Sequence, residues 1–236
     1  MSDQVLRENK ADEAYALIKE KIIDFEYMPG MAVTELDLCK QLNMSRTPVR
    51  IALARLTAEG FITEIGPKKN MIADVSVDSF IDVYRIREAL DLLSVRTACY
   101  TWHNKSEIDG LRRMIEEQKE LTSKAQVDSR AFLKMDKEYH KAIVAMTRNK
   151  LLCKEIAYIY DLYWRYDFYS IHVSGYRTTV TEHERIADAI ERRDATQCVE
   201  QTKQHLETVK EFILVGIAKG FTPLNMNNAK IGYVLR

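Results

Sequence analysis

The spacing of apolar residues in the first sixty positions predicts three helices. Apolar positions three or four residues apart indicate the first helix, over residues 11–25. Thr34 and Ser45 are suited to cap two further helices, because their hydroxyl oxygens can accept a hydrogen bond from the first-turn backbone amides. The third helix is expected to run to residue 59 and to end at Gly60, which tolerates the left-handed conformation that closes many helices.

The period then changes from helical to alternating. Residues 61–65 and 71–75 alternate between apolar and polar side chains, as two short strands do, and residues 66–70 are suited to join them as a hairpin. Three helices followed by a hairpin is the element order of a winged helix-turn-helix. We therefore expect a first domain of this kind over residues 8–75.

Beyond a short polar joint, the helical pattern is nearly continuous. The chain has only 8 Gly and 4 Pro, which argues for long helices and against a turn-rich β-sandwich or barrel. We expect an all-α bundle over residues 79–218, with Ser106 and Asp194 as caps, followed by a tail over residues 219–236. The fold class is therefore mainly α. Its six bundle helices are expected at residues 79–103, 107–123, 129–147, 151–171, 177–193 and 195–218.

Composition and charge narrow the class of protein. Hydrophobic residues make up 46% of the 236 residues, which excludes a disordered chain. The net charge is +0, yet residues 40–70 carry six basic and two acidic side chains, a local net +4. Such an island can be a nucleic-acid-binding surface. Chance clustering explains the local charge equally well, so charge alone does not show that this segment binds nucleic acid.

The apolar stretches, the N-terminus and the cysteine spacing all indicate a cytoplasmic location for this protein. The longest apolar stretch near the C-terminus covers about seven residues, whereas a membrane-spanning helix needs roughly twenty. The charged N-terminus has no secretory signal, and the four cysteines are too far apart in the sequence to form a CxxC motif. We expect a cytoplasmic protein with reduced thiols that binds no membrane.

The third predicted helix has a basic face. Arg46 and Arg50 are four residues apart and share a side, with Thr47 beside them. Guanidinium groups at the start of an exposed helix can bind guanine or phosphate in a major groove. Lys68 and Lys69 at the hairpin tip are suited to phosphate or minor-groove contacts. The alternative is an ordinary solvated helix face. The opposite, apolar side carries Val49, Ala52, Leu53 and Leu56.

Three segments of this region resemble the GntR family of bacterial transcription regulators: MPG at residues 28–30, LNMSRTPVR at 42–50 and ARLTAEGFI at 54–62. The resemblance implies that the SRTPVR run contacts operator DNA. Its candidate contact residues are Ser45, Arg46, Thr47 and Arg50.

The sequence differs from the usual family pattern at two places. The wing tip has Lys69-Asn70 where the family usually has Arg-Gly, and Ile51 stands where an acidic residue is usual. Contact between the wing and the minor groove is therefore less firmly implied than contact by the helix. Lys68 and Lys69 remain the candidate wing contacts.

Three of the five histidines lie on faces that should be buried. His140 follows Asp136 by one helical turn on an apolar stripe, and His183 and His205 occupy the apolar stripes of two other predicted helices. A buried carboxylate is costly without a partner, and one cation would satisfy it together with three neutral imidazoles. The alternative for each histidine is a hydrogen-bonded core residue. His103 and His172 show no such placement.

The second half of the chain also resembles a known domain. The segments DKEYH at residues 136–140, NKLL at 149–152 and HERI at 183–186, with His205-Leu206, are similar to the FCD domain of FadR-type GntR regulators. That resemblance covers roughly residues 79–215. It implies that Asp136, His140, His183 and His205 bind a divalent metal in an all-helical ligand pocket. Zinc and nickel are both compatible with such nitrogen-rich ligation.

Arg87 is a candidate effector-binding residue. It shares a stripe with Val83 and Leu90, and the resemblance implies that an arginine at this point faces the carboxylate of the ligand. The alternative is a surface salt bridge with Glu88 or Asp91. Seven aromatic residues between Tyr158 and Tyr169 occupy all sides of one predicted helix, which suggests a pocket wall or an interface in addition to core packing.

These observations predict a homodimeric bacterial transcription regulator and not an enzyme. We expect it to act as a repressor that binds a palindromic operator and senses a small organic acid at the metal. One alternative is a metal-dependent hydrolase or lyase with an accessory nucleic-acid-binding domain, in which Glu182 is the candidate general base. A second is a nucleoid-type DNA binder whose histidines are structural.

Overall fold

The computed structural model describes residues 3–66, 69–170 and 175–219. The chain forms two compact units, residues 1–75 and 76–236, and each is described by itself. The fold class predicted from the sequence, a winged helix-turn-helix followed by an all-α domain, is confirmed. No helix within the described ranges has the length and apolar character needed to cross a membrane.

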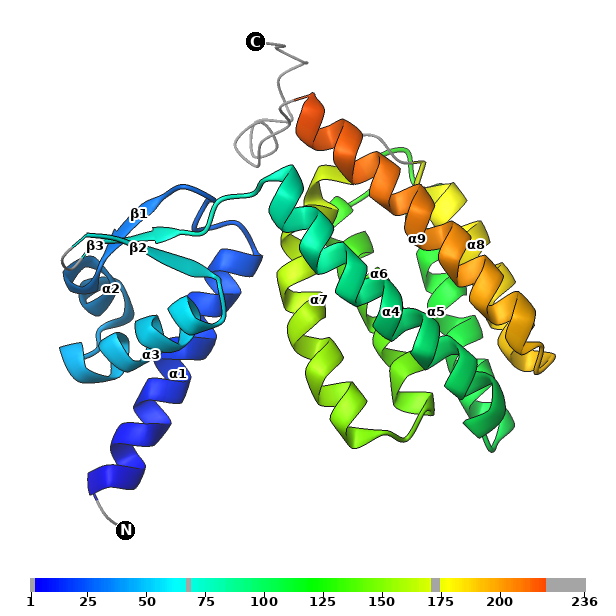
Figure 1. Ribbon diagram of the computed structural model, residues 1–236, viewed down its shortest axis with the longest axis horizontal. Coiled ribbons are helices and arrows are strands. Elements are labelled where there is room, and N and C mark those ends of the chain that lie inside the picture. The colour runs from blue at the N-terminus through cyan, green and yellow to red at the C-terminus, as the bar shows by residue number, and fades with distance from the viewer. Residues whose placement is uncertain (1–2, 67–68, 171–174, 220–236) are drawn as a thin grey trace. The chain divides into compact units, whose positions relative to one another are not determined.

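The N-terminal unit is a three-helix winged fold with a small antiparallel sheet (Figure 1). The strands lie in the order β1-β3-β2, with Val33 and Glu64 both paired with Asn70 of β3. The first helix packs against the third, and their buried apolar side chains form the core of this unit. Its elements are α1 (Asp3–Ile23), β1 (Ala32–Thr34), α2 (Glu35–Leu42), α3 (Arg46–Ala58), β2 (Ile62–Gly66) and β3 (Lys69–Ile72).

The local signals act largely as expected in this unit. Thr34 caps α2 by accepting a hydrogen bond from the Asp37 amide at 3.2 Å, and Gly60 follows α3 with a φ of +75°. Ser45 occupies the cap position of α3, but its hydroxyl makes no capping hydrogen bond. The strand β1 was not predicted, because three residues are too few to show an alternating period.

The C-terminal unit is a bundle of six helices whose predicted positions are confirmed to within two residues at each end (Figure 1). α4 packs against α6, α7 and α9, and α8 packs against α5 and α9. Aliphatic and aromatic side chains from α4, α5, α6, α8 and α9 form one large core. Leu152, Ile156 and Tyr160 of α7 form a separate buried cluster with Val144 of α6. The helices are α4 (Val77–Thr101), α5 (Lys105–Ser123), α6 (Ser129–Met146), α7 (Lys150–Ser170), α8 (Tyr176–Glu191) and α9 (Ala195–Ala218).

Two details fix the helix ends and the helix spacing. Asp194 caps α9 as predicted, but the cap of α5 is Asn104 and not Ser106, because Asn104 has the extended backbone and its side chain accepts from the Glu107 amide. Gly216 lets α9 approach α7 closely, since a Cβ at this position would lie 2.0 Å from the carbonyl oxygen of Tyr169. The close approach sets the position of α9 in the bundle.

Candidate metal centre

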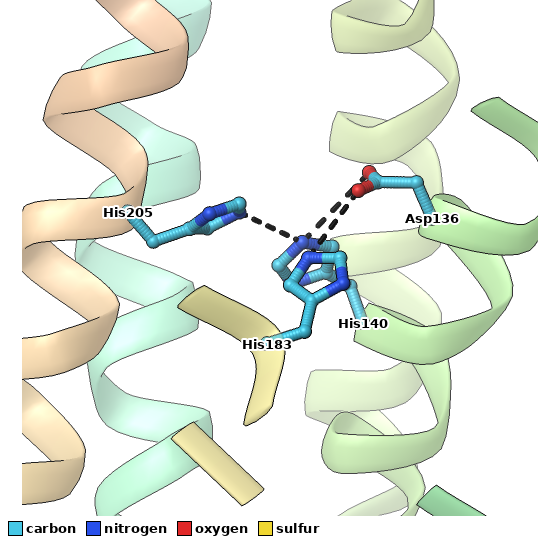
Figure 2. A group of neighbouring side chains, drawn as sticks. All are labelled: Asp136, His140, His183 and His205. Carbon is cyan, nitrogen blue, oxygen red and sulfur yellow. Dashed lines mark hydrogen bonds and ion pairs between the residues drawn. The ribbon is translucent and has the colours of Figure 1, made fainter. Parts of the chain in front are cut away.

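Three helices bring one carboxylate and three imidazoles to a common point inside the C-terminal unit. α6 supplies Asp136 and His140 one turn apart, α8 supplies His183, and α9 supplies His205 (Figure 2). One possible ligand atom from each residue lies within 4.8 Å of the others. All four residues are buried, as their apolar stripes predicted.

The distances between the donor atoms are short. His183 Nε2 lies 3.3 Å from Asp136 Oδ1, and His140 Nε2 lies 3.8 Å from Asp136 Oδ2. The Nε2 atoms of His140 and His205 are 3.3 Å apart. Figure 2 shows the four side chains pointing toward one another from three helices, with Asp136 and His140 on the same one. Donors at ~2.1 Å around a tetrahedral ion are ~3.4 Å apart, close to the two shortest of these distances.

Neighbouring side chains fix the orientation of two imidazoles. Gln118 Oε1, which can only accept, lies 2.8 Å from His183 Nδ1, so Nδ1 carries the proton and Nε2 presents its lone pair to the site. Glu182 Oε2 accepts from His205 Nδ1 at 2.9 Å in the same way, and Thr208 donates to its other oxygen. Such outer partners are typical of histidines that bind metal.

Burial sets the protonation states in the site. Burial lowers the pKa values of His140 and His183 well below the ordinary value, and nearby positive charge, including that of Arg87, lowers them further. Both imidazoles are therefore neutral at pH 7, the form that binds a metal. Burial also raises the pKa of Asp136, because a carboxylate without a cation is poorly stabilised there.

The residues fit a divalent metal ion. His183 Nε2 is buried and has no hydrogen-bond partner among the described residues, although it points at Asp136 Oδ1. A buried unpaired nitrogen is costly, and a metal ion would give it a partner. Three imidazole nitrogens and one carboxylate oxygen form a donor set that suits zinc or nickel.

Arg87 lies beside this centre and is fully buried. Its Nε donates to Asp91 at 3.1 Å, and its Nη1 lies 3.8 Å from Asp167 Oδ1. Its guanidinium stacks 3.9 Å from the centre of the Tyr163 ring. The sequence alternative of a pair with Asp91 is confirmed, but its expected surface position is wrong, because α4 turns Arg87 inward, where α7 and α9 pack against this helix. The buried Tyr160 hydroxyl donates to Asp91 at 2.5 Å.

A narrow cavity of about 20 Å³ connects Arg87 to the centre. Asp136 and His205 line it together with Asp167, Ser170 and Thr179. Four tyrosines of the aromatic-rich α7 are buried, and Tyr160 and Tyr163 contact Arg87, so part of this helix forms a wall of the site. His103 is exposed and distant in sequence from the cluster, and His172 lies outside the described residues.

In the N-terminal unit the candidate DNA-contacting residues are solvent-exposed. Ser45, Arg46, Thr47 and Arg50 are exposed at the start of α3, while its opposite side is buried against α1. Lys69 is exposed at the start of β3, and Lys68 lies outside the described residues.

A further basic residue of segment 40–70 makes contacts inside the N-terminal unit. Arg55 pairs with Asp12 at 2.5 Å and stacks on Tyr15, both in α1. Asn70, the second residue of the wing pair Lys69-Asn70, is buried in the sheet. The basic face of α3 is therefore formed by Arg46 and Arg50 at its N-terminal end.

A winged helix followed by an all-helical domain with a buried polar site defines a class of transcription regulators in which one chain combines a DNA-binding head with a sensor domain. Residues 82–208, more than half of the chain, match the FCD domain family, and residues 10–66 match the gntR family of bacterial regulatory proteins. The chain belongs to the GntR family of transcription regulators that carry an FCD domain.

Known relatives match nearly the whole chain. It is 29% identical over 208 residues to the Nta operon transcriptional regulator of Aminobacter aminovorans, covering 88% of this chain and 96% of the relative. It is 23% identical to the transcriptional repressor RspR of Escherichia coli, covering 85% and 87%. Among solved structures, E. coli McbR/YncC has the same fold, with a TM-score of 0.73 at 18% identity, covering 87% of this chain and 97% of that one.

Sequence reasoning missed part of the surroundings of the metal centre. Gln118 was not singled out, although it lies on the buried stripe of α5 with Ile115 and Leu111, and a polar residue at such a position was the available signal. Glu182 was considered only as a general base. Tyr139 donates to the His183 carbonyl at 2.8 Å and stacks on its ring, a contact that no spacing rule indicates.

The Gln118 contact gives a testable prediction. We expect Gln118→Met to weaken zinc binding by about 10–100-fold, because His183 loses the acceptor that fixes its tautomer and ring orientation. Competition against a chromophoric chelator measures the change. Gln204→Met, the same substitution at an exposed position of α9, is the control and should leave zinc affinity unchanged. Equal zinc affinities for wild type and Gln118→Met would show that Gln118 does not orient His183 as a metal ligand.

Proposed function

We propose that this protein is a metal-dependent repressor whose affinity for DNA is controlled by a small carboxylate bound in the C-terminal unit. The observation that carries the proposal is the buried cluster of one aspartate and three histidines beside a buried arginine. A metal ion with open coordination positions accepts carboxylate oxygens, and the arginine can pair with the same ligand. The two groups would thus recognise an organic acid together.

Asp136, His140, His183 and His205 would hold the metal. Zinc is the first choice and nickel the second, since both accept imidazole nitrogen and carboxylate oxygen. When bound, the metal supplies a positive charge and coordination positions for the effector. Glu182 and Gln118 hold two of the imidazoles in the orientation that this requires.

The effector site would lie in the cavity between Arg87 and the four ligands. Its volume of about 20 Å³ is smaller than any organic acid, so effector binding must widen it and move helices that line it. α4 carries Arg87 and follows directly on the winged unit in the chain. Movement of α4 would therefore change how the DNA-binding heads are held, because the two binding events are linked through one conformational equilibrium.

The DNA-binding surface would consist of Ser45, Arg46, Thr47 and Arg50 in a major groove, with Lys68 and Lys69 on the adjacent backbone or minor groove. One winged helix reads few base pairs, so two copies on a palindromic operator would provide specificity. We expect the regulator to act as a homodimer in the cytoplasm.

A catalytic role is the weaker candidate. Glu182, the candidate general base, has one carboxylate oxygen on His205 and the other on Thr208, so both are engaged within the fold. The metal would anchor the effector instead of activating water. A panel of ester and organic-acid substrates should therefore give no turnover with zinc-loaded protein.

The effector proposal is tested with Arg87→Lys. A panel of small mono- and dicarboxylates is added to zinc-loaded protein bound to its operator, and DNA release is followed by fluorescence anisotropy. We expect one acid to release wild type, and Arg87→Lys to need at least about tenfold more of it, because lysine keeps the charge but loses the bidentate geometry. Lysine also leaves a cation beside Asp91 and Asp167, which preserves the fold.

The control for this experiment is Arg113→Lys, the same substitution at an exposed position of α5. It should respond to the acid as wild type does. Release that is equal in Arg87→Lys and wild type, or that needs no metal, would contradict the proposed effector site.

A further inference from the structure

Ile51 is a large apolar side chain on the exposed side of α3. It is 42% exposed, whereas the apolar residues on the opposite side of the helix are buried in the core of the N-terminal unit. The exposed side also carries the two arginines proposed to enter the major groove. We call this side the outer face of α3; its residues are Arg46, Thr47, Arg50, Ile51 and Ala54.

The outer face consists of two adjacent rows in which side chains are spaced by one helical turn. The first row is Arg46, Arg50 and Ala54, and the second is Thr47 and Ile51. Arg55, which continues the second row, is held against α1 by its ion pair with Asp12. Ile51 is therefore the last residue of the second row that belongs to the outer face, and it lies directly beside Arg50.

The GntR family usually has an acidic residue at the position of Ile51. A carboxylate can accept a hydrogen bond from a base, but the side chain of isoleucine can neither accept nor donate one. A single exposed isoleucine is common on protein surfaces. Ile51, however, would be dehydrated against the edges of the bases when the outer face lies in a major groove. Its contact in the groove must then be apolar.

The major groove presents one apolar group to such a side chain, the C5-methyl group of thymine. Against the polar edge of a cytosine or a purine, Ile51 would dehydrate donors and acceptors without replacing their hydrogen bonds, which is costly. Against a thymine methyl group, it would remove apolar surface of both partners from water. The chemistry of Ile51 therefore favours thymine over the other three bases.

We propose that Ile51 reads the C5-methyl group of a thymine in each half-site of the operator, beside the base pair that Arg50 contacts. Ile51 can act in this way only if α3 lies in the major groove, as proposed above. It then determines sequence specificity at a position that the arginines do not read. The methyl group belongs to one base of the A·T pair, so the contact also fixes the orientation of that pair.

Exchange of thymine for deoxyuridine tests the contact, because uracil lacks only the methyl group. Each thymine of the operator selected from random duplexes is exchanged in both half-sites, and the affinity of the full-length protein is measured by fluorescence anisotropy at fixed salt. For at least one thymine, we expect the exchange to weaken wild type by about fourfold for each half-site, the effect of one buried methyl group.

Ile51→Ala should lose this sensitivity. It should bind the unmodified operator more weakly than wild type does, but the same exchange should change its affinity by less than about twofold, because the methyl group no longer has a partner. Ile51→Val keeps a branched apolar side chain and should remain sensitive. Ile65→Ala, at a 49% exposed isoleucine of β2, is the matched control. It should respond to every exchange as wild type does, since the minor groove has no thymine methyl group for the wing to contact.

Two results would overturn the role of Ile51: an operator with no methyl-sensitive thymine, or equal sensitivity of wild type and Ile51→Ala at every thymine. Arg50→Ala distinguishes these results from failure of the proposed DNA-binding surface. If Arg50→Ala binds the operator as tightly as wild type, α3 does not lie in the groove and both proposals fail. If Arg50→Ala binds weakly and no thymine effect depends on Ile51, only the role of Ile51 is rejected.

Discussion

Removal of metal with a chelator should lower the melting temperature of this protein by roughly 6–16 °C. The expected cause is the loss of a ligand that joins α6, α8 and α9 through Asp136, His140, His183 and His205. An ion at a hundred to a thousand times its dissociation constant stabilises the native state by about 3–4 kcal/mol, which gives a shift of that size for a domain of this length. Differential scanning fluorimetry with and without added zinc measures it.

His183→Ala should resemble chelated wild type and should not respond to zinc. His103→Ala, the same substitution at an exposed histidine, is the matched control and should melt and respond as wild type does. If the histidines were only hydrogen-bonded core residues, His183→Ala would still be destabilised, but chelation would leave wild type unchanged. That combination would contradict the metal assignment.

The second large effect is expected at the DNA-binding surface. Arg50→Ala should weaken operator binding by about 1–3 kcal/mol for each half-site, because an exposed guanidinium at the start of α3 is lost from the groove. The operator is first identified by selection from random duplexes, and affinity is then measured by fluorescence anisotropy at fixed salt. Discrimination against a scrambled duplex should fall as well.

Arg113→Ala removes the same charge from an exposed position on α5 and is the control for general electrostatic attraction. It should bind the operator as wild type does. Zinc affinity and melting temperature should be unchanged in Arg50→Ala, since Arg50 lies in the N-terminal unit and the metal centre lies in the C-terminal unit. Operator binding by Arg50→Ala as tight as wild type would show that the assignment of α3 to the groove is wrong.

Much of the fold follows from spacing in the sequence. The bundle helices are long and strongly periodic, so their ends are predicted to within two residues. The start of α1 at Asp3 was missed, because its first residues are polar and show no apolar stripe, and β1 was missed because its pairing with β3 is a tertiary contact. Ser106 and Asn104 are both good caps by type, and only the backbone conformation distinguishes them.

The candidate site was predictable for one physical reason. A carboxylate and imidazoles on apolar stripes are buried when the helices pack, and buried polar groups must find partners. Spacing within one helix placed Asp136 and His140 together, but the convergence of α6, α8 and α9 is a property of the packed bundle. The roles of Gln118 and Glu182 depend on contacts between residues 65 and 23 positions apart in sequence, which no local pattern encodes.

The position of Arg87 could not be decided from the apolar periodicity of its helix alone. Its stripe with Val83 and Leu90 indicated an inward direction, yet neighbouring acids in the sequence supported a surface pair nearly as well. The structure places Arg87 inside the bundle with Asp91, Asp167 and Tyr163, two of which come from α7. Burial of a guanidinium is tolerated there because two carboxylates and an aromatic ring surround it.

The metal content of the protein tests the central claim most directly. Protein purified without an affinity tag, and without added metal, is analysed by inductively coupled plasma mass spectrometry alongside His183→Ala. We expect close to one equivalent of zinc or nickel per wild-type chain and almost none in the variant. Less than about a tenth of an equivalent of any transition metal in wild type, with no melting shift on adding zinc or nickel, would contradict the metal centre.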